Sequence, residues 1–322
     1  MTKIVITGSH LTPALALTEQ LPANWRAYEL GEDDSPRFRR YDWWGSALGL
    51  FKLPGLVWKT TSKLQLIKPA VVVSFGGYSA VPVCLAAWWL KLPLLIHEQT
   101  FGVGLATKIT SRLASQVAIS WQSSRGYFSA KKTVLTGNPV RKAILNLTRS
   151  PRPVILITGG HQGSLVINQA IGPILHRLLK RFTVYHQYGL SQPEELTHPR
   201  YHAQRWFNTQ ELARIYSKAQ LVVGRAGINT VTELAYLKLP AVLIPLPYTQ
   251  RGEQLRNALY LKSLGLAVIL PQAKLTPGNL HQAIIRANSK LPRNPKVNFP
   301  ARRVATAAQS LYQLVAKLRR DV

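Results

Sequence analysis

Acidic residues and cysteine are both scarce in this chain of 322 residues. Its one cysteine, Cys84, excludes an internal disulfide framework and any zinc site built from several cysteines. Only 13 acidic residues accompany 41 lysines and arginines, which gives a formal net charge of +28. Such a field favours nucleic acid, anionic lipid or phosphorylated substrates, and the alternative is a solvated basic surface. We expect no metal site, because the sequence contains no metal-ligand cluster, and the acidic run at 31–36 is typical of a surface loop.

A long apolar run is also missing. The most apolar stretch, 81–97, is interrupted by Lys91 and Pro93. Neither part reaches the roughly 20 residues that a membrane-spanning helix needs. The amino terminus leads straight into a strand-like segment, so we expect no signal peptide. The sequence therefore predicts a protein that is soluble or lies on a membrane surface, in a reducing compartment.

Short apolar, β-branched runs alternate with helical patterns along most of the chain. Continuously apolar strands separated by helices predict an α/β fold with two doubly wound parallel sheets. A polar, proline-containing segment at 146–153 suggests a linker. We therefore expect an N-terminal domain over 1–147, a C-terminal domain over 148–299, and a basic amphipathic helix within 300–322 that closes the second domain or crosses back to the first. Strands are predicted at 3–7, 70–75, 93–97, 116–120, 133–137, 153–158, 183–188, 221–224, 241–246 and 267–271, and helices at 163–180, 227–237, 252–264 and 277–287.

Polar, glycine-containing turns follow most of the predicted strands. Ligands of open α/β sheets bind at the carboxyl ends of the strands, so two such domains facing each other would bring these turns to one cleft. The turn after 153–158 contains Gly159, Gly160 and Gly163 and precedes a helix. Free backbone amides and the helix dipole favour an anion there. The turn is neither a Walker loop nor a complete dinucleotide fingerprint, and a plain glycine turn is the alternative.

Four charged or titratable residues are candidates for chemistry. Glu233 stands in the first turns of the helix that follows Gly227. Its carboxylate suits a vicinal diol such as ribose, although acids also stabilise first turns on their own. His10 follows the first strand and is a candidate proton acceptor at neutral pH. Glu98 ends another strand, where a structural role is the alternative, and Arg141 is placed to reach a phosphate.

Six motifs together resemble, in the same order, those of the MurG family of glycosyltransferases. The resemblance runs from about Lys3 to about Ala287. It implies the two-domain GT-B fold. It also implies transfer of N-acetylglucosamine from the UDP-sugar to a lipid-linked muramyl-pentapeptide of peptidoglycan, at the cytoplasmic face of the membrane. The motifs are FGGYSAVP (75–82), HEQTFGVG (97–104), GNPVR (137–141), ITGGHQGS (157–164), GRAGINTVTELAYLKLPAVLIP (224–245) and EQLRNA (253–258).

The resemblance also implies site roles. Glu233 matches the acid that holds the ribose, and Phe207 matches the position that borders the uracil. Inversion at the anomeric carbon needs a base, for which His10 and Glu98 are rivals. No cofactor is expected, although a divalent cation can accompany the nucleotide. The UDP-sugar site would comprise Arg141, Gly160, His161, Gln162, Gly163, Ser164, Phe207, Ile228, Asn229, Thr230, Glu233, Glu253 and Gln254, and the acceptor site Gly8, Thr12, Gly76, Gly77, Tyr78, Gln99 and Thr100.

The segment 41–69 mixes tryptophan, phenylalanine and leucine with lysines. This mixture suits a peripheral segment on an anionic membrane surface, and the alternative is a helix packed on the sheet. Three other functions stay open. One is a GT-B glycosyltransferase with a different lipid or soluble acceptor, and another is a UDP-sugar epimerase. The third is a non-enzymatic polyanion-binding protein, but no nucleic-acid recognition motif is present, so we expect no nucleic-acid partner.

Overall fold

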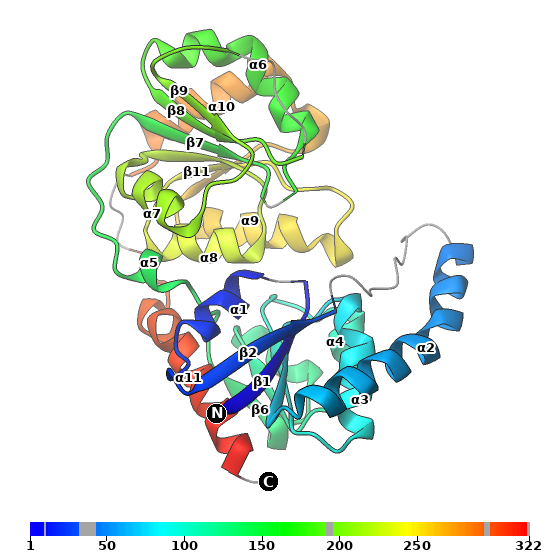
Figure 1. The fold of residues 1–322 in the computed structure, drawn as a ribbon. Coiled ribbons are helices and arrows are strands. Elements are labelled where there is room, and N and C mark those ends of the chain that lie inside the picture. Colours follow the sequence, from blue (N-terminus) through cyan, green and yellow to red (C-terminus); the bar gives the residue numbers. More distant parts are fainter. Residues whose placement is uncertain (10, 32–42, 161, 191–195, 293–296, 321–322) are drawn as a thin grey trace. The chain divides into compact units, whose positions relative to one another are not determined.

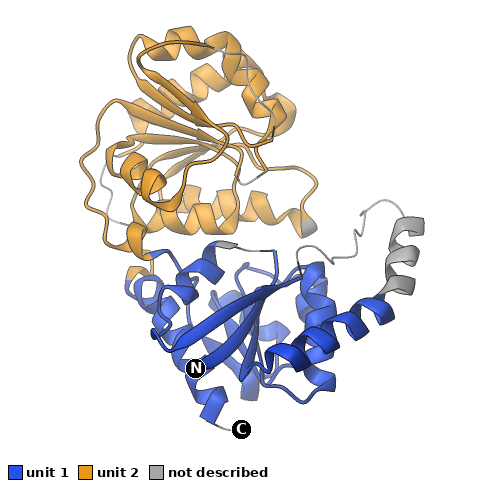
Figure 2. Ribbon diagram, in the orientation of Figure 1, with its two compact units in different colours: residues 1–141, 302–322 blue, residues 142–301 orange. Residues whose placement is uncertain are grey.

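The computed structural model describes residues 1–9, 11–31, 43–160, 162–190, 196–292 and 297–320 (Figure 1). Contacts divide the chain into two compact units (Figure 2). Unit 1 comprises residues 1–141 and 302–322, and unit 2 comprises residues 142–301. The boundary falls between Arg141 and Lys142, a few residues before the predicted one at 147/148, and the C-terminal helix joins unit 1.

Unit 1 contains a six-stranded sheet of order β2-β1-β3-β4-β5-β6, in which every pairing is parallel. Val5 of the first strand packs with residues of α2 and α3 on one face, whereas Ile4 and Ile6 pack with α1 and α11 on the other. This alternation is the period of two expected for a strand covered on both sides. The elements are β1 (Thr2–Thr7), α1 (Leu11–Thr18), β2 (Trp25–Leu30), α2 (Trp43–Ile67), β3 (Val71–Ser74), α3 (Val81–Trp89), β4 (Leu94–Glu98), α4 (Leu105–Thr110), β5 (Gln116–Ile119), β6 (Thr133–Leu135) and α11 (Ala301–Arg320), with 3₁₀ turns at Tyr78–Ala80, Gln122–Tyr127 and Ala130–Lys132.

Unit 2 repeats the design with a parallel sheet of order β12-β11-β10-β7-β8-β9. Helices α6 and α10 cover one face and contribute apolar side chains to a single core with Ile155, Ile157 and Val223. Helices α7, α8 and α9 lie over the other face (Figure 1). The elements are α5 (Lys142–Leu145), β7 (Val154–Thr158), α6 (Leu165–Leu179), β8 (Thr183–Gln187), β9 (Tyr201–Gln204), α7 (Thr209–Lys218), β10 (Leu221–Gly224), α8 (Ile228–Tyr236), β11 (Ala241–Leu243), α9 (Glu253–Ser263), β12 (Ala267–Ile269) and α10 (Pro277–Lys290), with 3₁₀ turns at Gln250–Gly252 and Gln272–Lys274.

The predicted fold class is confirmed, because both sheets are parallel and helix-covered. Strand order reverses between β1 and β3 in unit 1 and between β7 and β10 in unit 2. Such reversal points leave a crevice at the carboxyl ends of the two strands, where ligands bind. Among the described residues, no helix combines the length and apolarity needed to cross a lipid bilayer.

Candidate active site

A glycine turn follows β7 at the reversal point of unit 2. Gly160 and Gly163 have φ of +82° and +76°, a region that favours glycine. A Cβ on Gly163 would lie 2.1 Å from the carbonyl oxygen of Tyr188, so no larger residue fits there. The turn ends at Ser164, the N-cap residue of α6, and this places the first amides of a 15-residue helix at the crevice. Such a helix start attracts an anion.

Arg225, directly after β10, bridges this turn to the neighbouring strand. Its Nη2 donates to Oγ of Ser164 at 2.8 Å, and its Nη1 donates to the carbonyl of Ile244 at 3.0 Å. Burial lowers the pKa of Arg225, but a guanidinium stays charged at neutral pH. A fixed positive charge therefore lies beside the amino end of α6. Arg225 was not among the site residues predicted from sequence, although a lone cation directly after an apolar strand was a usable signal.

The first turns of α8 lie next to Arg225 in the chain. Ile228 is buried, and Asn229 and Thr230 are half-buried. Glu233 is only 3% exposed, and the hydroxyl of Tyr216 donates to its Oε2 at 3.4 Å. Its carboxylate is thus held inside unit 2 near the crevice end of the helix, and its role toward ribose stays a prediction.

The start of α9 is fastened to the turn after β10. Oε1 of Gln254 accepts from the backbone N–H groups of Ala226, at 3.3 Å, and Leu246, at 3.0 Å. The amide of Asn257 donates to the carbonyl of Ala226 at 2.9 Å. A sugar hydroxyl read by Gln254 would therefore accept from its amide nitrogen, while Glu253 stands half-buried as the first residue of the helix.

Phe207 and the glycine turn are joined by a side chain that the sequence analysis missed. Oε1 of Gln187, the last residue of β8, accepts from the N–H of Phe207 at 3.1 Å. Its Nε2 donates to the carbonyl of Gly160 at 3.1 Å and to Oγ1 of Thr158 at 3.3 Å. The residues predicted to border uracil and diphosphate are thus neighbours in unit 2. The polar pair His186–Gln187 at the end of an apolar strand was the available signal.

In unit 1 the turns after β1 and β3 meet at the other reversal point. The N–H of Ser9 donates to the carbonyl of Gly76 at 3.2 Å, and a Cβ on Gly8 would lie 2.7 Å from that carbonyl. Gly77 also lies against Ser9, and Tyr78, the next residue, is 42% exposed. The structure therefore brings Gly8, Gly76 and Gly77 together, and Thr12 lies in the adjacent first turn of α1.

The turn after β4 is braced by Glu98, which is 4% exposed. Its Oε1 accepts from the N–H and Oγ1 of Thr100, at 2.9 and 2.7 Å, and its Oε2 accepts from the N–H of Gly104 at 3.3 Å. Nε2 of Gln99 donates to the carbonyl of Phe75 at 2.9 Å and so ties this turn to the one after β3. Proton acceptance by Glu98 would disrupt its own turn, which favours a bracing role over that of a base.

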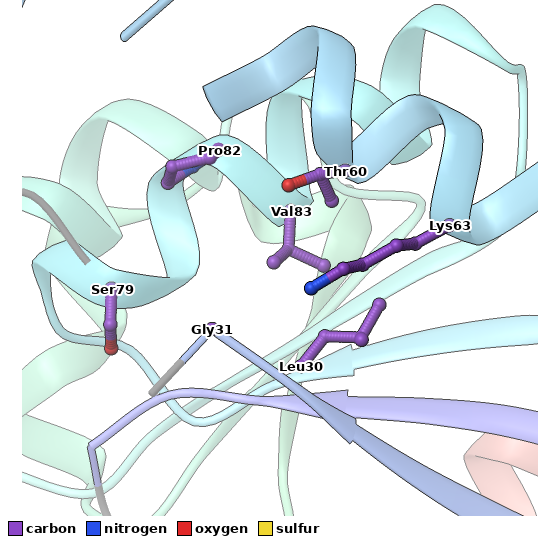
Figure 3. A pocket seen from close by; sticks show the side chains of 7 residues that line it. All are labelled: Leu30, Gly31, Thr60, Lys63, Ser79, Pro82 and Val83. Carbon is purple, nitrogen blue, oxygen red and sulfur yellow. The ribbon is translucent and has the colours of Figure 1, made fainter. Parts of the chain in front are cut away.

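A small cavity lies beside these turns, between the end of β2, α2 and the start of α3 (Figure 3). Lys63 extends its ammonium group toward the space near Thr60, Val83 and Leu30. The cavity measures about 10 Å³, room for about one water molecule, so it cannot admit a sugar. Among the described residues, no group of histidine, cysteine, aspartate and glutamate side chains is arranged to hold a metal ion.

Some predicted site residues cannot be placed with the others. His10, His161 and most of the acidic run 31–36 lie outside the described residues. Gln162 is exposed on the glycine turn. Arg141 is buried as the last residue of unit 1, whereas the turn it was predicted to serve belongs to unit 2, so that pairing stays a prediction.

Comparison with known proteins identifies relatives over most of the chain. Residues 154–313 match the glycosyltransferase family 28 C-terminal domain, and residues 34–119 match its N-terminal domain. Two similar proteins are named UDP-N-acetylglucosamine–N-acetylmuramyl-(pentapeptide) pyrophosphoryl-undecaprenol N-acetylglucosamine transferase. The one from Lachnospira eligens is 31% identical over 88% of this chain and 90% of its own length. The one from Nitrosospira multiformis is 33% identical over 87% of each.

A solved structure agrees with these sequence matches. Acinetobacter baumannii MurG aligns with 98% of this chain and 100% of its own, at 25% identity and a TM-score of 0.68. The two parallel sheets, the glycine turn before α6 and the α8 motif occur in the order that the resemblance requires. The chain therefore belongs to glycosyltransferase family 28 and, within it, to the MurG group of N-acetylglucosamine transferases.

Proposed function

We propose that this protein transfers N-acetylglucosamine from UDP-N-acetylglucosamine to undecaprenyl-pyrophosphoryl-N-acetylmuramyl-pentapeptide, a step of peptidoglycan synthesis. One observation carries the proposal: relatives whose names state this reaction are 31% and 33% identical across nearly nine-tenths of the chain. The crevices at the two reversal points supply a donor site in unit 2 and an acceptor site in unit 1.

The donor site would bind the nucleotide through a positive charge and through backbone amide groups. The amides at the start of α6 and the guanidinium of Arg225 face the position of a diphosphate beside Ser164. They would also take up the charge that develops on UDP as the glycosidic bond breaks. Removing one such preorganised donor typically costs about 10²–10³ in rate. Phe207 would border the uracil, and Glu233 would hold the ribose.

The remaining contacts of the donor follow from the same motifs. Gly160, His161, Gln162 and Gly163 would line the diphosphate, with Arg141 as a further cation. Ile228, Asn229 and Thr230 would line the nucleotide-sugar, and Glu253 and Gln254 would read the sugar. The protein would need no cofactor of its own, although a divalent cation can accompany the nucleotide.

The acceptor would lie on unit 1. Gly8, Gly76 and Gly77 present backbone at the reversal point between β1 and β3, and Thr12, Tyr78, Gln99 and Thr100 border it. The acceptor hydroxyl would attack the anomeric carbon in line, with inversion. We assign the base to His10, because both oxygens of Glu98 already accept hydrogen bonds from the 100–104 turn.

A lipid-linked acceptor requires contact with a membrane, and unit 1 presents a surface suited to it. Trp58 of α2, Trp88 and Trp89 of α3, and Ile109 of α4 are 76%, 53%, 72% and 54% exposed. Helices α2, α3 and α4 lie side by side in unit 1 (Figure 1). Lysines accompany the exposed apolar residues in the sequence of this region. Exposed aromatic residues beside cations favour peripheral binding to an anionic bilayer, which for this reaction is the cytoplasmic face.

The deciding experiment is transfer of labelled N-acetylglucosamine from the UDP-sugar to a short-chain lipid-linked muramyl-pentapeptide. Formation of the disaccharide-linked product, with release of UDP, supports the proposal. Transfer to a different lipid or to a soluble acceptor, with none to the muramyl lipid, would make the protein a different glycosyltransferase. Conversion of the UDP-sugar without any acceptor would instead identify an epimerase. Failure to bind UDP at all would remove the whole assignment.

A further inference from the structure

A buried chain of hydrogen bonds runs behind the glycine turn, across β9, β8 and α6. Nδ1 of His186 lies 2.9 Å from the hydroxyl of Tyr201, and its Nε2 lies 3.1 Å from Oδ1 of Asn168. Nδ2 of Asn168 donates to the carbonyl of Tyr188 at 3.1 Å. Asn168 stands in the first turn of α6, and His186 is fully buried. These hydrogen bonds therefore attach the amino end of α6 to strands β8 and β9.

The donor and acceptor of each of these hydrogen bonds follow from the backbone carbonyl of Tyr188. A backbone carbonyl can only accept, so the amide nitrogen of Asn168 must point to Tyr188 and its oxygen to His186. Nε2 of a neutral His186 must then carry the proton and donate to Asn168. Nδ1 is left as an acceptor for the hydroxyl of Tyr201, whose pKa burial raises to about 12, so that it keeps its proton. One tautomer satisfies all three bonds.

Gln187, the next residue along β8, points to the opposite face of the strand and holds the other side of the turn. It links Thr158 and Gly160 to the N–H of Phe207 through three hydrogen bonds. Two adjacent residues of one strand thus hold the turn from both faces. Neither is among the residues to which the motifs assign a substrate contact.

We propose that His186 and Gln187 are positioning residues that keep the glycine turn and the start of α6 in the shape that binds the nucleotide diphosphate. His186 acts through Asn168 on the helix, and Gln187 acts through Gly160 on the turn and through Phe207 on the segment beside the base. The inference rests on the proposed function, because the turn is taken to bind UDP.

Gln187→Ala tests the proposal at Gln187, which is less deeply buried than His186. The matched control is Gln204→Ala, which removes an exposed glutamine from the end of the neighbouring strand β9. We expect Gln187→Ala to raise the Kd for UDP, measured by calorimetry, and the KM for UDP-N-acetylglucosamine by about tenfold, while kcat changes less than twofold. This pattern indicates loss of binding shared by ground and transition states. Gln187→Glu keeps an acceptor for Phe207 but loses both donors, so it should bind no better than the alanine variant.

The possible outcomes distinguish failure of the positioning role from failure of the proposed function. A Kd within twofold of wild type for Gln187→Ala, even with a lowered melting temperature, would make its role merely structural and overturn the inference. Wild-type protein that binds UDP but transfers no sugar would remove the proposed function, while the comparison of Kd values still decides the inference. Wild-type protein that does not bind UDP would overturn both.

A spectroscopic measurement tests the proposed role of His186 independently of Gln187. Nitrogen-15 NMR of the histidine side chains should show His186 at neutral pH with its proton on Nε2 and none on Nδ1. Tyr201→Phe removes only the distal hydroxyl and should raise the Kd for UDP by about threefold. A proton on Nδ1 of His186 in the wild-type protein would contradict the assigned hydrogen-bond directions and overturn the proposed role of His186.

Discussion

Lowering the pH from 7 to 4 is expected to destabilise unit 2 through His186. Full burial of this side chain, which is 0% exposed, lowers its pKa from 6.5 to about 4. The unfolded chain therefore binds a proton at this residue in a range where the folded chain does not. The associated stability is fully present above about pH 6.5 and is lost as the pH falls toward 4, because protonation then favours the unfolded state.

The magnitude follows from the two pKa values. The difference between 6.5 and about 4, at about 1.4 kcal/mol per pKa unit, amounts to about 3–4 kcal/mol in full. About 3 kcal/mol of it is lost between pH 7 and pH 4, because the folded group is only half protonated at pH 4. Small domains are stable by only about 5–15 kcal/mol, so this loss is measurable. Urea unfolding followed by circular dichroism should be carried out on wild type and His186→Gln at several values between pH 4 and pH 7. The contributions of other titrating groups to the free energy of unfolding cancel in the difference between the two proteins.

The expected result is a stability difference that shrinks by about 3 kcal/mol from pH 7 to pH 4. His202→Gln, which removes an exposed histidine from β9, is the control for loss of a ring from this sheet. A wild-type minus His186→Gln difference that stays constant with pH would refute the reasoning, because it would mean that His186 titrates alike in the folded and unfolded chains.

Three further predictions, tested by four substitutions, concern other parts of unit 2. Glu233→Ala should weaken UDP binding by about tenfold to a hundredfold in calorimetry, since hydrogen bonds to a charged group contribute about 1.5–3 kcal/mol, and unchanged affinity would remove the ribose role. Arg149→Ala deletes three hydrogen bonds to backbone carbonyls at the carboxyl ends of α7 and α8 and should cost about 2 kcal/mol in urea unfolding; a loss below about 0.5 kcal/mol would show that water replaces the guanidinium. Gly163→Ala should abolish UDP binding because its Cβ meets the carbonyl of Tyr188, whereas Gly160→Ala meets no atom within 4 Å and should do less harm; equal effects in a binding assay would contradict this contrast.

The interior strands were predictable from sequence because burial on both faces leaves a continuous apolar run. The strands VVVS at 71–74 and VILIT at 154–158 are buried at every position. The two strands that the sequence analysis missed, β2 and β9, lie at sheet edges. Their sequences, WRAYEL and YHAQ, carry exposed positions, since an edge strand pairs on one side only and is less fully covered. No local apolar pattern marked them.

The candidate site likewise contains residues that could be predicted from local sequence and residues that could not. Glycines, a helix start and a lone acid such as Glu233 leave local signals, so the turn after β7 and the motif on α8 could be recognised in order. The roles of Arg225 and Gln187 depend on which residues lie across the sheet from them. Those neighbours come from segments 19 to 61 positions away along the chain, and no spacing rule connects them.

The return of α11 to unit 1 has a consequence for the nascent chain. Leu311, Val315 and Leu318 pack with Ile4 and Leu17, residues that are translated long before them. The sheet of unit 1 is therefore synthesised before part of its cover, and the face that α1 and α11 share stays partly exposed until α11 has been made. Unit 2, encoded in between, is the first to be completed, so the order of synthesis is the reverse of the order in which the two cores can close.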